Sequence, residues 1–183
     1  MPAQPKRTHV LTLALLVAAM MLGTPWPSIA GESQGEKHWA GSGRRQVEVL
    51  NALPAHFDTK VDRVLAEWER SGVVDFLVRP SAQDGCDSLP DAALLLCWRA
   101  GLRTDGEATT ASYGDHITSA LVAIEVEGAK RVRAVLCHEV GHTLGLEHRG
   151  SGRTCMKHPI DPENAAPDAR DLETLRAGYS HSD

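Results

Sequence analysis

The stretch H-E-V-G-H-T-L-G-L-E-H, residues 138–148, decides what this chain can fold into. His138 and His142 stand four residues apart, so on a helix they lie on the same face and can hold one metal ion from one side. Glu139 follows the first histidine, where its carboxylate can reach a metal-coordinated water without itself being a ligand. The stretch therefore predicts a helix that carries two metal ligands and a general base.

Two further positions complete the predicted site. Gly145 lies three residues after His142, where a left-handed helix end needs a residue without a β-carbon. Such a turn swings the chain back and lets His148 take a third coordination position. Three neutral imidazoles leave one tetrahedral position for water, which distinguishes a catalytic zinc site from a closed structural one. We therefore predict Zn²⁺ bound by His138, His142 and His148.

These residues match the extended signature H-E-x-x-H-x-x-G-x-x-H at every fixed position. On that match the chain resembles the metzincin clan of zinc endopeptidases. The resemblance implies an α/β (α+β) fold: a mixed twisted sheet with an active-site helix, a methionine turn beneath the zinc and a C-terminal helix. It also implies that Glu139 is the catalytic residue. The alternative is a helix with ordinary surface or core histidines, in which the glycine and the third histidine would have no role.

A methionine eight residues after His148 supports the resemblance. Met156 follows a Thr-Cys pair, and its polarizable side chain can pack under the imidazoles and hold their orientation. The short interval is similar to the matrixin branch, and the cysteine directly before the methionine is similar to the adamalysin branch. The astacin branch has a tyrosine just after this methionine. Residues 157–159 here read Lys-His-Pro, so no tyrosine ligand is expected.

The chain also departs from the matrixin pattern. No cysteine lies between the N-terminal apolar segment and the first predicted strand, so the cysteine that usually keeps matrixins latent is missing. No clear second histidine set or carboxylate-rich loop is present for additional structural ions. His116 and Asp115 could contribute to one, although a loop histidine is more often solvated than metal-bound.

The first thirty residues have the pattern of a secretory signal peptide. Lys6 and Arg7 precede an apolar run over residues 10–22, and Ser28 and Ala30 are small residues at the positions that a signal peptidase reads. The run is shorter than the ~20 residues of a comfortable membrane span. We therefore expect residues 1–30 to be removed and the protein to be secreted. An uncleaved signal anchor is the alternative.

The rest of the chain has the size of one domain. We expect a flexible N-terminal arm over residues 31–45 and a zinc metallopeptidase catalytic domain over residues 46–183. The formal net charge is −5, and lysine and arginine are not clustered, which argues against nucleic acid or an anionic membrane as a partner. The expected partner is a protein or peptide substrate, with no stable membrane association and a monomeric state.

The four cysteines follow the signal-like segment. An even number in an exported domain favours two disulfides, for which three pairings can be drawn. We favour Cys86 with Cys97, which bracket a short segment, and Cys137 with Cys155. The second bond would join the active-site helix to the turn beneath the metal. The alternative is a thiolate ligand, but three histidines suffice, and Cys137 lies on a different helix face from the histidine next to it.

The hydrophobic pattern predicts the opening of an α/β sheet. Apolar residues between Pro54 and Arg70 recur at intervals of three and four, which indicates an amphipathic helix. The run Ala92–Trp98 is apolar enough to be a strand buried on both faces. The chain turns polar over Thr109–Gly114, and the resemblance implies that the region Thr109–Thr118 forms the sheet edge that binds an extended substrate. The other predicted elements are strands over Gln46–Asn51, Val73–Val78 and Ile117–Val126, a helix over the zinc histidines and a closing helix from about Asp168 to Ala177.

The function that these features favour is a secreted zinc endopeptidase. Zinc would polarise the scissile carbonyl and lower the pKa of a water, whose proton Glu139 would accept and pass to the leaving amine. One alternative is a secreted zinc hydrolase of a non-peptide amide, because the walls of the cleft cannot be read from the sequence. Another is a non-catalytic binding module in which zinc staples a small domain. Glu139 argues against the module, because a structural site needs no base.

Overall fold

The computed structural model describes residues 37–181, apart from residues 84 and 127. The predicted signal peptide over residues 1–30 lies outside the described residues, as does the first part of the predicted arm. Each predicted helix or strand that forms begins and ends within two residues of its expected limits, with one exception. The first helix begins at Asp58 and not at Pro54, because a short 3₁₀ turn precedes it. In chain order the elements are β1 (His38–Trp39), β2 (Arg45–Ala52), η2 (Ala55–Phe57), α1 (Asp58–Glu69), β3 (Val74–Pro80), β4 (Ala93–Trp98), β5 (Gly106–Tyr113), β6 (His116–Ile124), α2 (Ala129–Thr143) and α3 (Ala169–Gly178).

The six strands form one mixed sheet. Adjacent strands follow the order β3, β2, β4, β6. Strand β1 pairs with the start of β6, and β4 pairs with the end of β6, on the same side of that strand. All of these pairs are parallel, whereas β5 pairs antiparallel with β6 and forms an edge of the described sheet. β4 is buried on both faces, as its apolar sequence predicts. The predicted α/β class is confirmed.

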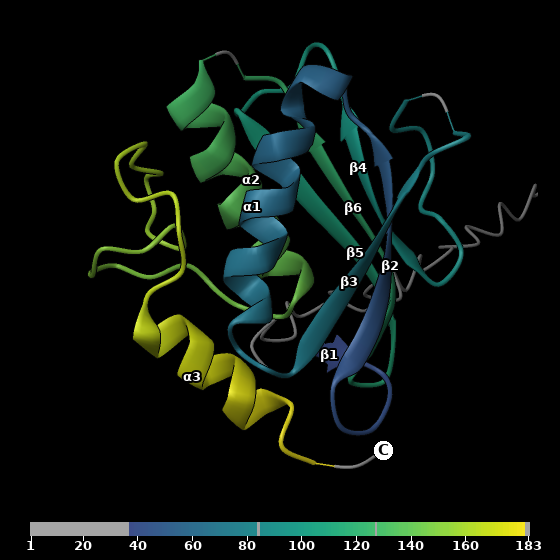
Figure 1. Ribbon diagram of the computed structural model, residues 1–183, viewed down its shortest axis with the longest axis vertical. Helices are drawn as coiled ribbons and strands as arrows, with labels where there is room; N and C mark the ends of the chain where they lie inside the picture. Colours follow the sequence, from purple (N-terminus) through teal and green to yellow (C-terminus); the bar gives the residue numbers. More distant parts are fainter. Residues whose placement is uncertain (1–36, 84, 127, 182–183) are drawn as a thin grey trace, which may run out of the picture. The chain divides into compact units, whose positions relative to one another are not determined.

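Helices α1 and α2 lie side by side over one face of the sheet (Figure 1). The predicted apolar stripe of α1 is buried there and includes Val61, Val64 and Trp68. The indole Nε1–H of Trp68 donates a 3.1 Å hydrogen bond to the main-chain carbonyl of Cys137 in α2. A buried indole needs such an acceptor, so this bond sets how the two helices meet.

Both favoured disulfides are present. Cys86–Cys97 joins the loop before β4 to β4 itself, on the sheet face opposite the two helices. Cys137–Cys155 joins α2 to the loop that leads to Met156. No described cysteine is free, so the alternative of a thiolate ligand is wrong.

Met156 packs directly against the backbone of α2. The side chain is fully buried, and a β-carbon built at Gly141 would lie 2.2 Å from its Sδ atom and 2.8 Å from Cζ2 of Trp68. Neither approach is compatible with any residue larger than glycine. The predicted packing of the methionine beneath the helix that carries the histidines is therefore confirmed, and Gly141 is what permits it.

A buried ion pair fastens the loop before Met156 to α3. Asp171 is 1 % exposed, and its carboxylate accepts a hydrogen bond from Arg149 Nη1 at 2.9 Å and another from the hydroxyl of Thr154. Arg149 also donates to Asp168, which caps α3, at 2.7 Å. Because a buried carboxylate is costly unless it is paired and hydrogen-bonded, these contacts hold loop and helix in one arrangement.

The segment predicted as a flexible arm, residues 31–45, includes a short buried strand in its second part. His38 and Trp39 are buried and form β1, parallel to the start of β6. The indole of Trp39 donates to the carbonyl of Thr143 at the end of α2, over 2.9 Å, and its main-chain N–H donates to the hydroxyl of Tyr179. A strand of two residues is too short to show a hydrophobic period, so the sequence pattern could not indicate it.

The polar segment Thr109–Gly114 is largely a strand that the periodicity did not predict. It belongs to β5, which has polar residues because one of its edges is unpaired in the described sheet. Of the region Thr109–Thr118 that the resemblance assigned to the sheet edge, the part in β5 lies at an edge, whereas residues 116–118 belong to β6, which is paired on both sides.

The packing of Met156 can be tested with a matched pair of glycine substitutions. In helices, Gly→Ala usually stabilises by about 0.5–1 kcal/mol. Gly178→Ala in α3 meets no atom within 4 Å, so it should leave the free energy of unfolding unchanged or higher. Gly141→Ala should instead lower it by about 1–3 kcal/mol, because the new methyl overlaps Met156 and Trp68. Urea denaturation of both variants measures the difference, and equal effects would refute the close contact.

Candidate metal centre

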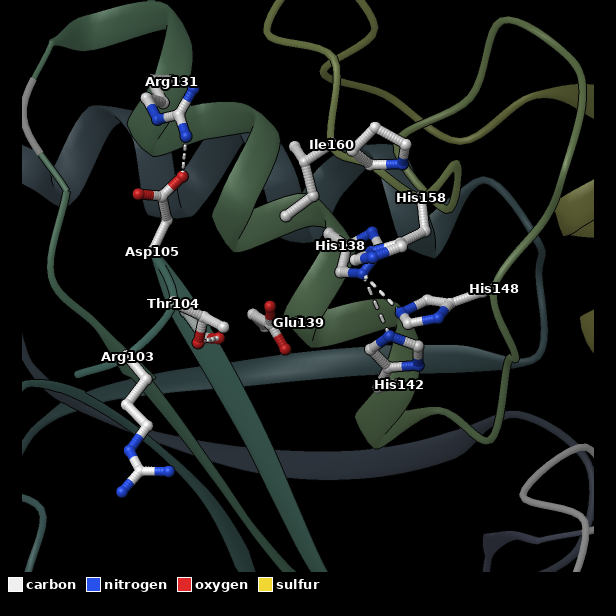
Figure 2. Close-up of a pocket in the computed structure, with 12 residues that line it drawn as sticks. Arg103, Thr104, Asp105, Arg131, His138, Glu139, His142, His148, His158 and Ile160 are labelled. Carbon is white, nitrogen blue, oxygen red and sulfur yellow. Dashed lines mark hydrogen bonds and ion pairs between the residues drawn. The ribbon is translucent and has the colours of Figure 1, made fainter.

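Helix α2 brings two of the predicted ligands together. The Nε2 atoms of His138 and His142 lie 3.1 Å apart, and the two rings are nearly perpendicular (Figure 2). Both side chains project from the same side of the last turns of α2, as a spacing of four residues requires. The helix alone therefore supplies one pair of donors.

A tight turn at the end of α2 brings the third histidine to the same point. Gly145 has φ +91°, and the N–H of Leu146 donates to the carbonyl of Gly141 at 3.1 Å, which is the outer bond of a Schellman motif. After this reversal, Nε2 of His148 lies 3.1 Å from Nε2 of His138. The predicted function of the glycine is confirmed, and the structure brings the three predicted ligands together.

Main-chain carbonyls fix the orientation of the first two rings. Nδ1 of His138 lies 2.7 Å from the carbonyl oxygen of Cys155, and Nδ1 of His142 lies 2.7 Å from that of Leu146. A carbonyl oxygen can only accept, so both Nδ1 atoms carry the proton. In the neutral rings both Nε2 atoms then present lone pairs toward each other.

Two facing lone pairs at 3.1 Å cannot form a hydrogen bond unless one ring gains a proton. Burial opposes that gain: it lowers the pKa of His138 to about 4 and also lowers the pKa of His142, and the neighbouring histidines add to the shift in both. A shared cation removes the conflict. Two nitrogens bound to a tetrahedral zinc at 2.0–2.1 Å are about 3.3 Å apart, close to the spacing found here. The donor set therefore fits zinc.

Glu139 lies beside the histidines with only 5 % of its surface exposed. Burial raises the pKa of its carboxyl to about 7, with a smaller contribution from the charge of Glu107. The start of β5 approaches closely, because a β-carbon built at Gly106 would lie 3.0 Å from Glu139 Oε1 and 2.5 Å from Val135 Cγ1. A carboxyl whose pKa lies near neutral pH is suited to accept a proton and to return it.

A cavity of about 510 Å³ joins these groups. The three histidines and Glu139 line it, and its other walls are the segment Arg103–Gly106 that leads into β5, Arg131 of α2, and residues 158–160 after the methionine. Figure 2 shows Glu139 between the histidines and the start of β5. The cavity therefore brings a candidate metal site, a protonatable carboxyl and a sheet edge together.

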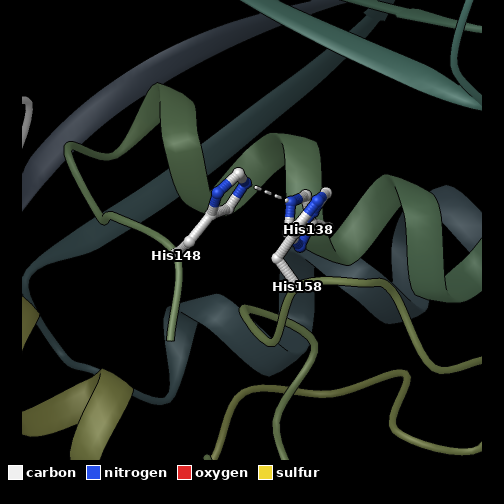
Figure 3. A group of neighbouring side chains, drawn as sticks. All are labelled: His138, His148 and His158. Atoms are coloured by element: carbon white, nitrogen blue, oxygen red, sulfur yellow. Dashed lines mark hydrogen bonds between the residues drawn. The ribbon is translucent and has the colours of Figure 1, made fainter. Parts of the chain in front are cut away.

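The sequence pattern assigns no metal role to one histidine that lines this cavity. The ring of His158 lies beside those of His148 and His138 (Figure 3). A histidine two residues after the buried methionine was the available signal. His116, in contrast, does not line the cavity; it lies at the start of β6 with its ring 5.0 Å from that of His38.

Comparisons with known proteins identify the fold. No protein-family model matches the chain, and no curated protein sequence is similar to it. Among solved structures, the chain is similar to high choriolytic enzyme 1, a hatching enzyme zinc-protease from Oryzias latipes (medaka fish), with a TM-score of 0.51 and 7 % identity over 78 % of this chain and 94 % of that one. A second match is archaemetzincin from Archaeoglobus fulgidus, with a TM-score of 0.42 and 18 % identity over 70 % of this chain and 99 % of that one.

At such low identity, the first of these matches establishes the fold and nothing finer, and the second carries no weight. The branch of metzincins to which the chain is most similar stays a prediction. The chain therefore shares the fold of that hatching enzyme zinc-protease, which is the kind of fold that its sequence resemblance implies.

Proposed function

We propose that this protein is a secreted zinc-dependent endopeptidase in which His138, His142 and His148 bind zinc and Glu139 is the general base. The observation that carries the proposal is the convergence of three imidazole Nε2 atoms, with 3.1 Å from His138 to each of the others, beside a buried carboxyl. A purely structural zinc site has no use for such a carboxyl or for an adjoining cavity.

The chemistry would be divided between the metal and the protein. Bound zinc supplies a Lewis acid that polarises the scissile carbonyl and makes a water more acidic. Glu139 accepts the proton of the attacking water on its carboxylate and returns it to the leaving nitrogen. The carbonyls of Cys155 and Leu146 keep the protons of two imidazoles on Nδ1, so both rings keep their lone pairs directed at the metal.

The sheet edge favours a peptide as the substrate. In the described sheet β5 pairs only with β6, which leaves its other edge open, and the strand begins at Gly106 in the wall of the cavity. An extended peptide can add to such an edge through main-chain hydrogen bonds that depend little on side chains. A compact non-peptide amide would have no use for this edge, which is why we prefer an endopeptidase to the alternative hydrolase.

Export is part of the proposal. Two disulfides in a domain of this size favour an oxidising compartment, and the first thirty residues have the signal-peptide pattern described above. None of the helices in the described part of the chain has the length and apolar content needed to cross a membrane.

The role of Glu139 can be tested by amide substitution. Glu139→Gln keeps the size of the side chain but removes the base, so kcat should fall by about 10²–10⁴-fold while one zinc ion per chain is retained. Cleavage of a mixed peptide pool, read by mass spectrometry, and metal analysis measure the two quantities. Glu147→Gln is the matched control, since Glu147 is exposed and does not line the cavity. Undiminished turnover in a zinc-loaded Glu139→Gln protein would rule out its role as base.

Removal of zinc should abolish hydrolysis and lower stability together. A ligand present at 1,000 times its dissociation constant stabilises the folded state by about 4 kcal/mol, so dialysis against dipicolinate should lower the Tm, and added zinc should restore both Tm and cleavage. His142→Ala should lose the zinc-dependent increase in Tm. Zinc-dependent stabilisation without cleavage of any peptide would instead support the binding module or the non-peptide hydrolase.

A further inference from the structure

The segment that carries His158 is held to the segment that carries His148 by backbone pairing. The N–H of Arg149 donates to the carbonyl of Met156 at 2.8 Å, and the N–H of His158 donates to the carbonyl of Arg149 at 3.2 Å. Arg149 and Lys157 form a short parallel bridge between the two segments. Since Arg149 is anchored to α3 and Met156 is buried under α2, the main chain at His158 has a defined place relative to the metal ligands.

The side chain of His158 is turned toward those ligands. Its ring is nearly parallel to that of His148, at 17° with 4.5 Å between centroids, and 6.4 Å from that of His138. One ring nitrogen from each of the three histidines lies within 4.8 Å of the other two (Figure 3). The motif histidines remain the tighter set, because the Nε2 atoms of His142 and His148 each lie 3.1 Å from that of His138.

His158 differs from two of the motif histidines in how its ring is held. His138 and His142 each donate Nδ1–H to a carbonyl, whereas no described residue forms a hydrogen bond with the ring of His158, which is exposed. An imidazole that only covers the neighbouring ring could be replaced by any flat side chain. An imidazole that donates a nitrogen to the metal could not.

We propose that His158 is a fourth imidazole donor to the metal in the substrate-free protein, and that substrate displaces it. The inference rests on the proposed function, because a site that kept all four side chains during turnover would be closed in the manner of a structural zinc site. His148 is exposed as well, but its Nε2 lies 3.1 Å from that of His138, whereas the ring of His158 has no such close contact in the described part of the chain, so His158 is the ligand of the four that leaves at least cost. The rings of His138 and His142 are held in place by their carbonyls.

Three substitutions separate donation from packing. His158→Ala removes the ring, and His158→Phe keeps a flat ring next to His148 but has no nitrogen. If His158 binds the metal, both variants should weaken zinc affinity by at least about tenfold and should change the visible absorption of the cobalt-loaded protein. His56→Phe, at an exposed histidine outside the cavity, should change neither.

Two patterns would overturn the proposal. Zinc affinities within about twofold of the unmodified protein for both variants would exclude a ligand at this position, since loss of even an outer partner of a metal site typically costs tenfold or more. Weaker binding by His158→Ala alone, with normal binding by His158→Phe, would reduce His158 to a packing partner of His148.

X-ray absorption at the zinc edge tests the same point on the unmodified protein and needs no variant to fold. Four imidazoles should be counted in the zinc-loaded protein and three after addition of a peptide hydroxamate; three in both states, or four in both, would contradict the proposal. These readouts do not require hydrolysis. Four imidazoles in a protein that cleaves no peptide would refute the proposed function, whereas peptide cleavage with three would refute only the role of His158.

Discussion

The convergence of the three histidines depends on two hydrogen bonds from imidazole Nδ1–H groups to main-chain carbonyls. One joins His138 to Cys155 and the other joins His142 to Leu146, both at 2.7 Å. Each bond fixes a ring and its tautomer, so that the lone pair on Nε2 faces the point where the three rings converge. Both acceptors belong to segments that follow α2. The placement of these segments therefore matters as much as the helix that carries the rings.

Much of the surrounding structure serves to hold those two carbonyls. The disulfide Cys137–Cys155 ties one of them to α2 directly, next to the ring that it binds. The Schellman turn at Gly145 holds the other, since Leu146 is bonded back to the helix. The ion pair of Arg149 with Asp171 and the burial of Met156 fix the loop between them. Covalent, backbone, electrostatic and packing constraints thus act on the same short part of the chain.

Burial gives the site its electrostatic character. It keeps the imidazoles neutral, because it lowers the pKa of His138 and His142, and it favours the protonated form of Glu139. A divalent cation reverses this balance by favouring the carboxylate and by satisfying the facing lone pairs. His148 and His158 are exposed, so this group of side chains is open to solvent on one side.

Local sequence patterns determined the helices, most strands and which three histidines the fold brings together. The spacing of His138 and His142 and the glycine at position 145 act within a few residues, so their consequences follow from helix and turn geometry alone. The apolar run of β4 and the stripe of α1 were likewise readable, because burial of whole faces leaves a period in the sequence.

Tertiary structure decided the features that depend on contacts between distant residues. The burial of Trp39 against the end of α2, the strand β5 at the sheet edge and the close approach of Gly106 to Glu139 have no local signature. The same holds for His158: its position relative to His148 results from the pairing of two loops and the anchoring of Arg149 to α3. A sequence pattern reports which face of a segment is buried, but only the folded chain decides what that face is buried against.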